Sequence, residues 1–277
     1  MKAKVNQVNQ VNRICMAACT AVVLLAGCAG GLPGAPPGVS GNQADLMTAS
    51  DEPEQRRRAR LRLELASAYF EQGQIRIALD EIKQSLAIDP SFVEAYNLRG
   101  LVYMRLNEVP LAEDSFRRAQ SLNPQDASVA HNYGWLLCQQ ARYSEAMPYF
   151  GRAIANPSYT GKAKTLMAQG VCQINAGQLS AAEQSLRHSY ELDAGNPVTG
   201  YNLANLLYKR GDLIRAQFYI RRLNNSELAN AETLWLGIKT EYKLNNREAV
   251  LQLAAQLKKR FAQSPQVTAY EKGSFNE

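Results

Sequence analysis

A small residue, glycine or alanine, returns six times along this chain at intervals of 33 to 36 residues. The six positions are Ala66, Gly100, Gly134, Gly170, Ala204 and Gly237. An alanine follows each of them twelve residues later, at Ala78, Ala112, Ala146, Ala182, Ala216 and Ala249. A period of this length over residues 56–277 indicates a stack of similar supersecondary units, each of which buries its apolar face against its neighbours.

Each unit is predicted to be a pair of helices. In the first unit Leu61, Leu65 and Tyr69 are spaced by four residues, which places them in one stripe of a helix. Gly73 then interrupts the pattern, and a second apolar stripe begins at Ala78. The small residues let the two helices of a pair approach closely, since larger side chains there would force them apart.

Proline-containing pairs are expected to end the second helices, because the residue before proline disfavours helical backbone. These pairs are Asp89-Pro90, Asn123-Pro124, Asn156-Pro157 and Asn196-Pro197. The period of about 34 residues is typical of tetratricopeptide repeats. The predicted fold is therefore all-α, a right-handed superhelix of six tetratricopeptide (TPR) helix-turn-helix repeats with a concave inner face that suits peptides or helices.

The N-terminal residues resemble a secretory signal that ends at a cysteine. Lys2, Lys4 and Arg13 precede an apolar run over residues 14–26, which is too short for a comfortable membrane-spanning helix. The stretch "LAGC" that ends at Cys28 resembles the lipobox of bacterial lipoproteins. That resemblance implies cleavage before Cys28 and attachment of acyl chains, palmitate among them, to it. Ala29 implies the outer membrane, because inner-membrane retention in this class favours aspartate there. A plain signal peptide with a chance cysteine is the alternative.

Three segments follow from these patterns. Residues 1–27 are the expected lipoprotein signal peptide, and residues 28–55 are the lipidated N-terminus with a flexible tether. Glycine and proline crowd residues 30–41, and such a stretch cannot bury enough apolar surface to offset the entropy of ordering it. Residues 56–277 form the six-repeat domain.

The composition gives no sign of catalysis or of nucleic-acid binding. The net charge of +6 is a mild surplus, and part of it lies in the expected signal peptide. The two histidines, His131 and His188, are far apart and lie in no metal-binding motif. Phosphate-binding loops and nucleophile elbows are missing as well. We therefore expect no enzyme activity, no metal, no cofactor and no small-molecule substrate.

Two cysteines remain in the repeat domain. Cys138 and Cys172 lie on the first helices of the third and fourth repeats, and an oxidising compartment would allow them to pair. They occupy the twelfth and tenth places of their repeats, so their side chains are expected to point differently. The sequence prediction is that both thiols are free and serve as small buried hydrophobes.

Two longer stretches carry a family resemblance. They are "HNYGWLLCQQARYSEAMPYFGRAI" at residues 131–154 and "LWLGIKTEYKLNNREAVLQLAAQLKKRF" at residues 234–261. Together they resemble the type IV pilus biogenesis lipoproteins of the PilF/PilW type, the pilotins. The resemblance implies a periplasm-facing outer-membrane lipoprotein that binds the secretin, the pore through which the pilus exits, and promotes its localisation and multimerisation. An adaptor for outer-membrane barrel assembly or for cell-wall enzymes is the alternative.

The partner-binding groove is expected on the inner surface of the first three repeats. Its predicted residues are the ones that the repeat pattern turns inward, together with neighbouring asparagines. They are Leu63, Ser67, Phe70, Asn97, Leu101, Met104, Asn132 and Trp135. Leu63 and Ser67 stand where one carboxylate-binding member of the class has lysine and asparagine, so that clamp is not expected. An apolar groove suits an amphipathic helix, and the hypothesis is a short helix near the C-terminus of the secretin.

Overall fold

The computed structural model describes residues 52–275, so the expected signal peptide, Cys28 and nearly all of the expected tether lie outside the described residues. Between residues 52 and 275 the chain forms thirteen α-helices and no strand. The helices are α1 (Glu54–Glu71), α2 (Ile75–Ile88), α3 (Val93–Arg105), α4 (Val109–Leu122), α5 (Ala127–Gln139), α6 (Tyr143–Ala155), α7 (Lys162–Asn175), α8 (Leu179–Leu192), α9 (Pro197–Lys209), α10 (Leu213–Asn224), α11 (Ala231–Lys243), α12 (Arg247–Arg260) and α13 (Pro265–Glu271).

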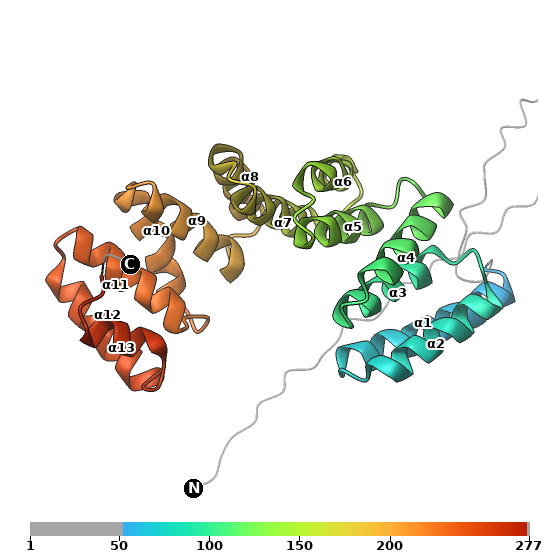
Figure 1. Ribbon diagram of the computed structural model, residues 1–277, viewed down its shortest axis with the longest axis horizontal. Helices are drawn as coiled ribbons and strands as arrows, with labels where there is room; N and C mark the ends of the chain where they lie inside the picture. The colour runs from blue at the N-terminus through green and yellow to red at the C-terminus, as the bar shows by residue number, and fades with distance from the viewer. Residues whose placement is uncertain (1–51, 276–277) are drawn as a thin grey trace, which may run out of the picture. The chain divides into compact units, whose positions relative to one another are not determined.

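The first twelve helices form six consecutive pairs, which confirms the predicted all-α repeat fold (Figure 1). We name the odd-numbered helices α1 to α11 the A helices and the even-numbered helices α2 to α12 the B helices. Each A helix packs on its own B helix and also on the A helix of the next repeat. The backbones of the described B helices stay apart from one another, and neighbouring B helices meet only through long side chains, such as the rings of Tyr190 and Tyr219. The A helices therefore line the concave side of the stack, and the B helices fan out on the convex side.

At the centre of each pair, the small residue of the A helix faces a side chain that follows it by sixteen residues on the B helix. A Cβ atom on Gly100 would lie 2.5 Å from Cε1 of Phe116, and a Cβ atom on Gly170 would lie 2.6 Å from Cγ of Leu186. These contacts are too short for real atoms, so glycine is required there. The close approach of the two helices is thus set by one small and one large residue in each repeat.

The A helix of each repeat connects to its B helix through a residue in the left-handed backbone region. Glycine fills this position in three repeats, and Asn107, Ala141 and Asn245 fill it in the other three, with φ between 55° and 59°. Left-handed backbone reverses the chain within a few residues, which is what an antiparallel helix pair needs.

One predicted helix end is placed wrongly by the sequence pattern. α8 ends at Leu192, before Asn196-Pro197. Asn196 instead caps the next helix, because its side-chain oxygen accepts hydrogen bonds from the backbone N–H groups of Val198 and Thr199. Pro197 is the first residue of α9, where proline is favoured since its missing N–H has no partner to lose.

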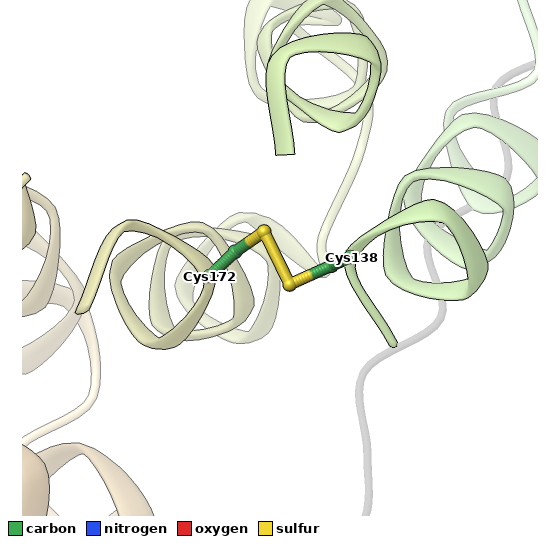
Figure 2. The surroundings of a disulfide bond; sticks show 2 residues. All are labelled: Cys138 and Cys172. Atoms are coloured by element: carbon green, nitrogen blue, oxygen red, sulfur yellow. A yellow bond between two sulfur atoms is a disulfide. The ribbon is translucent and has the colours of Figure 1, made fainter. Parts of the chain in front are cut away.

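Cys138 and Cys172 form a disulfide, so the prediction of two free thiols is wrong (Figure 2). The bond joins α5 to α7, and the two Cα atoms are 5.7 Å apart. Cys138 comes four residues after Gly134, whereas Cys172 comes two residues after Gly170. This offset turns the side chains about 200° apart around their helices. Side chains on two neighbouring A helices can meet only if one points forward along the stack and the other points backward. The offset between the two cysteines therefore favours the disulfide.

The short helix α13 packs on α11 and α12 at the C-terminal end of the stack. Its Val267 joins the last core cluster together with Leu234 and Leu257. Pro265 is therefore the first residue of a capping helix. None of the helices within residues 52–275 has the length and apolar character that crossing a membrane requires.

A candidate protein-binding groove on the A helices

A row of half-buried side chains runs along the concave side of the stack. In each of the first five repeats, the residue that directly follows the small residue of the A helix is half-buried. The members of this central row are Ser67, Leu101, Trp135, Val171 and Asn205. The row is apolar in its middle three members and polar at both ends, so its apolar part lies over repeats two to four.

Leu101, Met104 and Trp135 form the apolar centre of the predicted groove. All three are half-buried and pack against the core cluster that contains Phe116 and Phe150. One side of each residue is therefore held by the core, and the other side remains available to a partner.

Leu63 lies elsewhere than the sequence pattern predicted. Its side chain is 9% exposed and belongs to the first core cluster, together with Ala59 and Ile82. Phe70 is half-buried against the same cluster. Ser67 is half-buried, and its hydroxyl donates a hydrogen bond to the backbone oxygen of Leu63, 3.0 Å away. Leu63 is thus a packing residue, while Phe70 and Ser67 keep a partly open side.

Asn97 and Asn132 are brought together across the A helices α3 and α5. The Nδ2 atom of Asn132 donates a hydrogen bond to Oδ1 of Asn97 at 3.0 Å. Each amide therefore uses one of its two ends, which leaves the Nδ2 donor of Asn97 and the Oδ1 acceptor of Asn132. A donor and an acceptor held side by side can bond to the backbone of a bound peptide.

His131 is buried behind the groove rather than exposed in it. Its Nδ1 atom lies 2.9 Å from the hydroxyl of Thr165 on α7. Burial, helped by the nearby charge of Lys164, lowers the pKa of the imidazole from 6.5 to about 4. His131 is therefore neutral near pH 7, and it joins α5 to α7 on the side of the helices away from the groove.

The C-terminal end of the concave side carries an aromatic cluster that the sequence analysis missed. Trp235 and Tyr242 on α11 contact the ring of Phe275, which follows α13. The signal was present in the sequence, because Trp235 stands two residues before Gly237, at the same place in its repeat as Asn132. Extending the place of Asn132 to the sixth repeat would have found Trp235, whereas no predicted groove residue shares the place of Tyr242.

Among residues 52–275, no group of three or more histidine, cysteine, aspartate or glutamate side chains is placed to hold a metal ion. The predicted groove residues that stay half-buried are apolar, aromatic, amide and hydroxyl side chains, which suit binding of a polypeptide.

The stacked helix pairs and their inward-facing groove define a tetratricopeptide-repeat protein, and a family model described as tetratricopeptide repeat matches residues 63–127. The crystal structure of PilW, described as a widely conserved type IV pilus biogenesis factor, is 30% identical with a TM-score of 0.70, covering 76% of this chain and 97% of PilW. The solved PilF structure from Pseudomonas aeruginosa gives a TM-score of 0.73 at 24% identity, over 80% of this chain and all of that one.

A curated relative, the type IV pilus assembly protein PilF of Pseudomonas aeruginosa, is 26% identical over 220 residues, which are 79% of this chain and 86% of PilF. The chain belongs to the PilF/PilW family of type IV pilus biogenesis proteins.

Proposed function

We propose that this chain is a pilotin, an outer-membrane lipoprotein that binds the type IV pilus secretin and promotes its localisation to the outer membrane and its multimerisation. Membership of the PilF/PilW family supports a role in pilus biogenesis. The proposed chemistry is protein binding without catalysis and without a cofactor. A lipid on Cys28 would hold the domain at the periplasmic face of the outer membrane.

The observation that carries the proposal is the apolar centre of the groove beside the Asn97–Asn132 pair. An amphipathic helix presents apolar side chains at positions i, i+3, i+4 and i+7, and these would pack on Phe70, Leu101 and Trp135. With Leu63 in the core, Phe70 remains as the apolar contact in the first repeat. The occupant we propose is a short helix near the C-terminus of the secretin.

The direct test is a Leu101→Glu variant of the full chain. A charge in the apolar centre should weaken secretin binding by about tenfold or more, because burying one apolar anchor contributes about 1.5–3 kcal/mol. Binding is measured with the purified secretin, and secretin multimers are counted in envelope extracts. A second variant, with Asn97→Ala and Asn132→Ala together, should weaken binding without placing any charge in the groove.

Leu111→Glu is the matched control. Leu111 lies on the B helix of the same repeat and is 46% exposed on the convex side, so this change adds the same charge outside the groove. Both variants are first compared with the wild-type protein in helical content and thermal unfolding. If a folded Leu101→Glu variant binds the secretin with wild-type affinity and supports wild-type amounts of secretin multimers, the groove is not the secretin site.

A further inference from the structure

The chain folds its own end back onto the concave side of the last repeat. α13 ends at Glu271, and Gly273, with φ of 71°, reverses the backbone so that the chain returns toward α11. In Figure 1 the chain after α13 runs back toward α11. Phe275 is thus held against the groove by a turn that only a residue tolerant of left-handed backbone forms readily.

Phe275 sits among aromatic rings in the manner of a bound side chain. Its ring stacks on Tyr242 with a centroid distance of 4.3 Å and an interplanar angle of 22°. The ring centroid of Trp235 lies 5.7 Å from that of Phe275, with the two rings tilted. The centroid of Tyr270 lies 5.9 Å away, and this ring meets Phe275 edge to face. The hydroxyl of Tyr208 on α9 donates a hydrogen bond of 3.5 Å to the backbone oxygen of Phe275. The surrounding residues therefore contact both the ring and the backbone of Phe275.

A cleft opens next to this aromatic contact. It has a volume of about 500 Å³ and is lined by Tyr242, Lys243, Asn245, Arg247, Val250, Leu251 and Phe275. Tyr242 is 47% exposed and Leu251 is 65% exposed, so the cleft presents apolar surface to solvent. Apolar side chains that line one cleft together mark a contact site more often than exposed residues that are scattered singly.

The edge of the cleft is basic. Lys243 lies over the ring of Tyr208, 4.4 Å from its centroid, and Arg247 begins α12. Neither forms an ion pair with a carboxylate among the described residues. Glu241, on the same helix, is buried and fully engaged by Arg221, Gln217 and Asn246. The charge left at the cleft is therefore positive, and it favours an acidic partner.

We propose that the cleft at the C-terminal end of the stack, between the end of α11, the start of α12 and the returning tail, is a second peptide-binding site, which takes an acidic protein segment with an aromatic side chain, and that Phe275 occupies the place of that side chain in the free protein. The aromatic residue of the partner would stack on Tyr242 and Trp235, and its flanking carboxylates would face Lys243 and Arg247. The chain's own tail must leave for the partner to bind, so Phe275 lowers the apparent affinity of the site.

The test uses a fluorescein-labelled peptide of sequence Asp-Glu-Phe-Glu-Asp, titrated with the full chain and followed by fluorescence polarisation. A Phe275→Ala variant should bind this peptide about three- to tenfold more tightly than the wild-type protein, because the competing ring is gone. Phe275→Tyr should keep the wild-type affinity. Tyr242→Ala, and Lys243→Gln with Arg247→Gln, should each weaken binding, as should replacing the phenylalanine of the peptide by alanine.

Phe218→Ala is the matched control, since it removes an exposed ring from α10 that is in contact with Tyr219 and not with this cleft. Every variant is checked for wild-type helical content. The proposal is overturned if the folded Phe275→Ala variant binds the peptide no better than the wild-type protein, or if Tyr242→Ala leaves binding unchanged. Secretin binding of the Leu101→Glu variant is measured separately, so the proposed secretin groove and the proposed second site can each be contradicted independently.

Discussion

At the residue scale, one pair of side chains in each repeat decides how closely its helices approach. Glycine faces phenylalanine or leucine in the second, third, fourth and sixth repeats, whereas alanine faces isoleucine in the first and fifth, at Ala66–Ile82 and Ala204–Ile220. Isoleucine branches next to its own backbone and reaches less far, which leaves room for one methyl group. The alanine at position 204 is therefore a matched half of a pair, and it does not weaken the repeat pattern.

This pairing can be tested by exchange. Gly100→Ala should lower the free energy of unfolding by about 1–3 kcal/mol, because the new Cβ would overlap the fully buried ring of Phe116. Adding Phe116→Ile should recover part of the loss, since it recreates the alanine–isoleucine pair. Urea unfolding of the two single variants and the double variant measures the coupling. Strict additivity of the two changes would contradict a direct contact.

His131 should make stability depend on pH. Its pKa is about 4 in the folded chain and near 6.5 when unfolded, so the unfolded chain binds more protons between these values. Stability should therefore fall as the pH drops from about 6.5 to 4, by up to about 3 kcal/mol. His131→Gln lacks the titrating ring and should show a flatter profile in urea unfolding over that range. Parallel profiles for the two proteins would mean that His131 does not titrate this way.

At the scale of the helix pair, the turn from each A helix to its B helix uses left-handed backbone. The type of residue at this position determines the free-energy cost of that backbone conformation. Ala141 adopts φ of 55°, which its Cβ atom disfavours by roughly 1 kcal/mol, while Gly73 adopts φ of 74° without such a penalty. Ala141→Gly should therefore raise the midpoint of thermal unfolding, and Gly73→Ala should lower it. Shifts of the same sign would rule out the turn conformation as the cause.

The Cys138–Cys172 bond joins two A helices across the repeat with the longest spacing, 36 residues from Gly134 to Gly170. A disulfide of this kind contributes about 2–4 kcal/mol, mainly by restricting the unfolded chain. We expect a reducing agent to lower the thermal midpoint of the wild-type protein. The Cys138→Ala, Cys172→Ala variant should already melt at the lower temperature and should not respond to the reductant, which separates loss of the bond from other effects.

At the scale of the whole molecule, the proposed lipid on Cys28 decides where the repeat domain works. Acyl chains contribute about 0.8 kcal/mol per buried CH₂, and more than one chain is needed for stable anchoring. Cys28→Ser should shift the protein from the outer-membrane fraction to the soluble periplasm, or leave it as an uncut precursor. The Cys138→Ala, Cys172→Ala variant is the control and should stay with the membrane. Sedimentation of the Cys28→Ser protein with outer membranes would exclude this anchor.

The repeat architecture was predictable from the sequence, because it depends on small residues that recur at a fixed period. The exposure of individual groove residues was less so. Leu63 and Asn97 share a place in the repeat pattern that turns inward, yet Leu63 is buried and Asn97 is half-buried, since exposure depends on which neighbours cover each helix. The disulfide and the Phe275 contact depend on how one A helix meets the next and on where the tail returns, and no spacing within one repeat determines either.

Contacts between the described helices reach no further than two helices along the chain. Native structure can therefore be built from segments close in sequence, which is the arrangement that favours fast folding. A chain that crosses a membrane N-terminus first can complete its early repeats while the later ones are still to arrive. During the export that the proposed lipoprotein signal implies, Cys138 and Cys172, 34 residues apart, could be oxidised once α5 to α7 have emerged, whereas the site around Phe275 would become complete only when the last residues have been delivered.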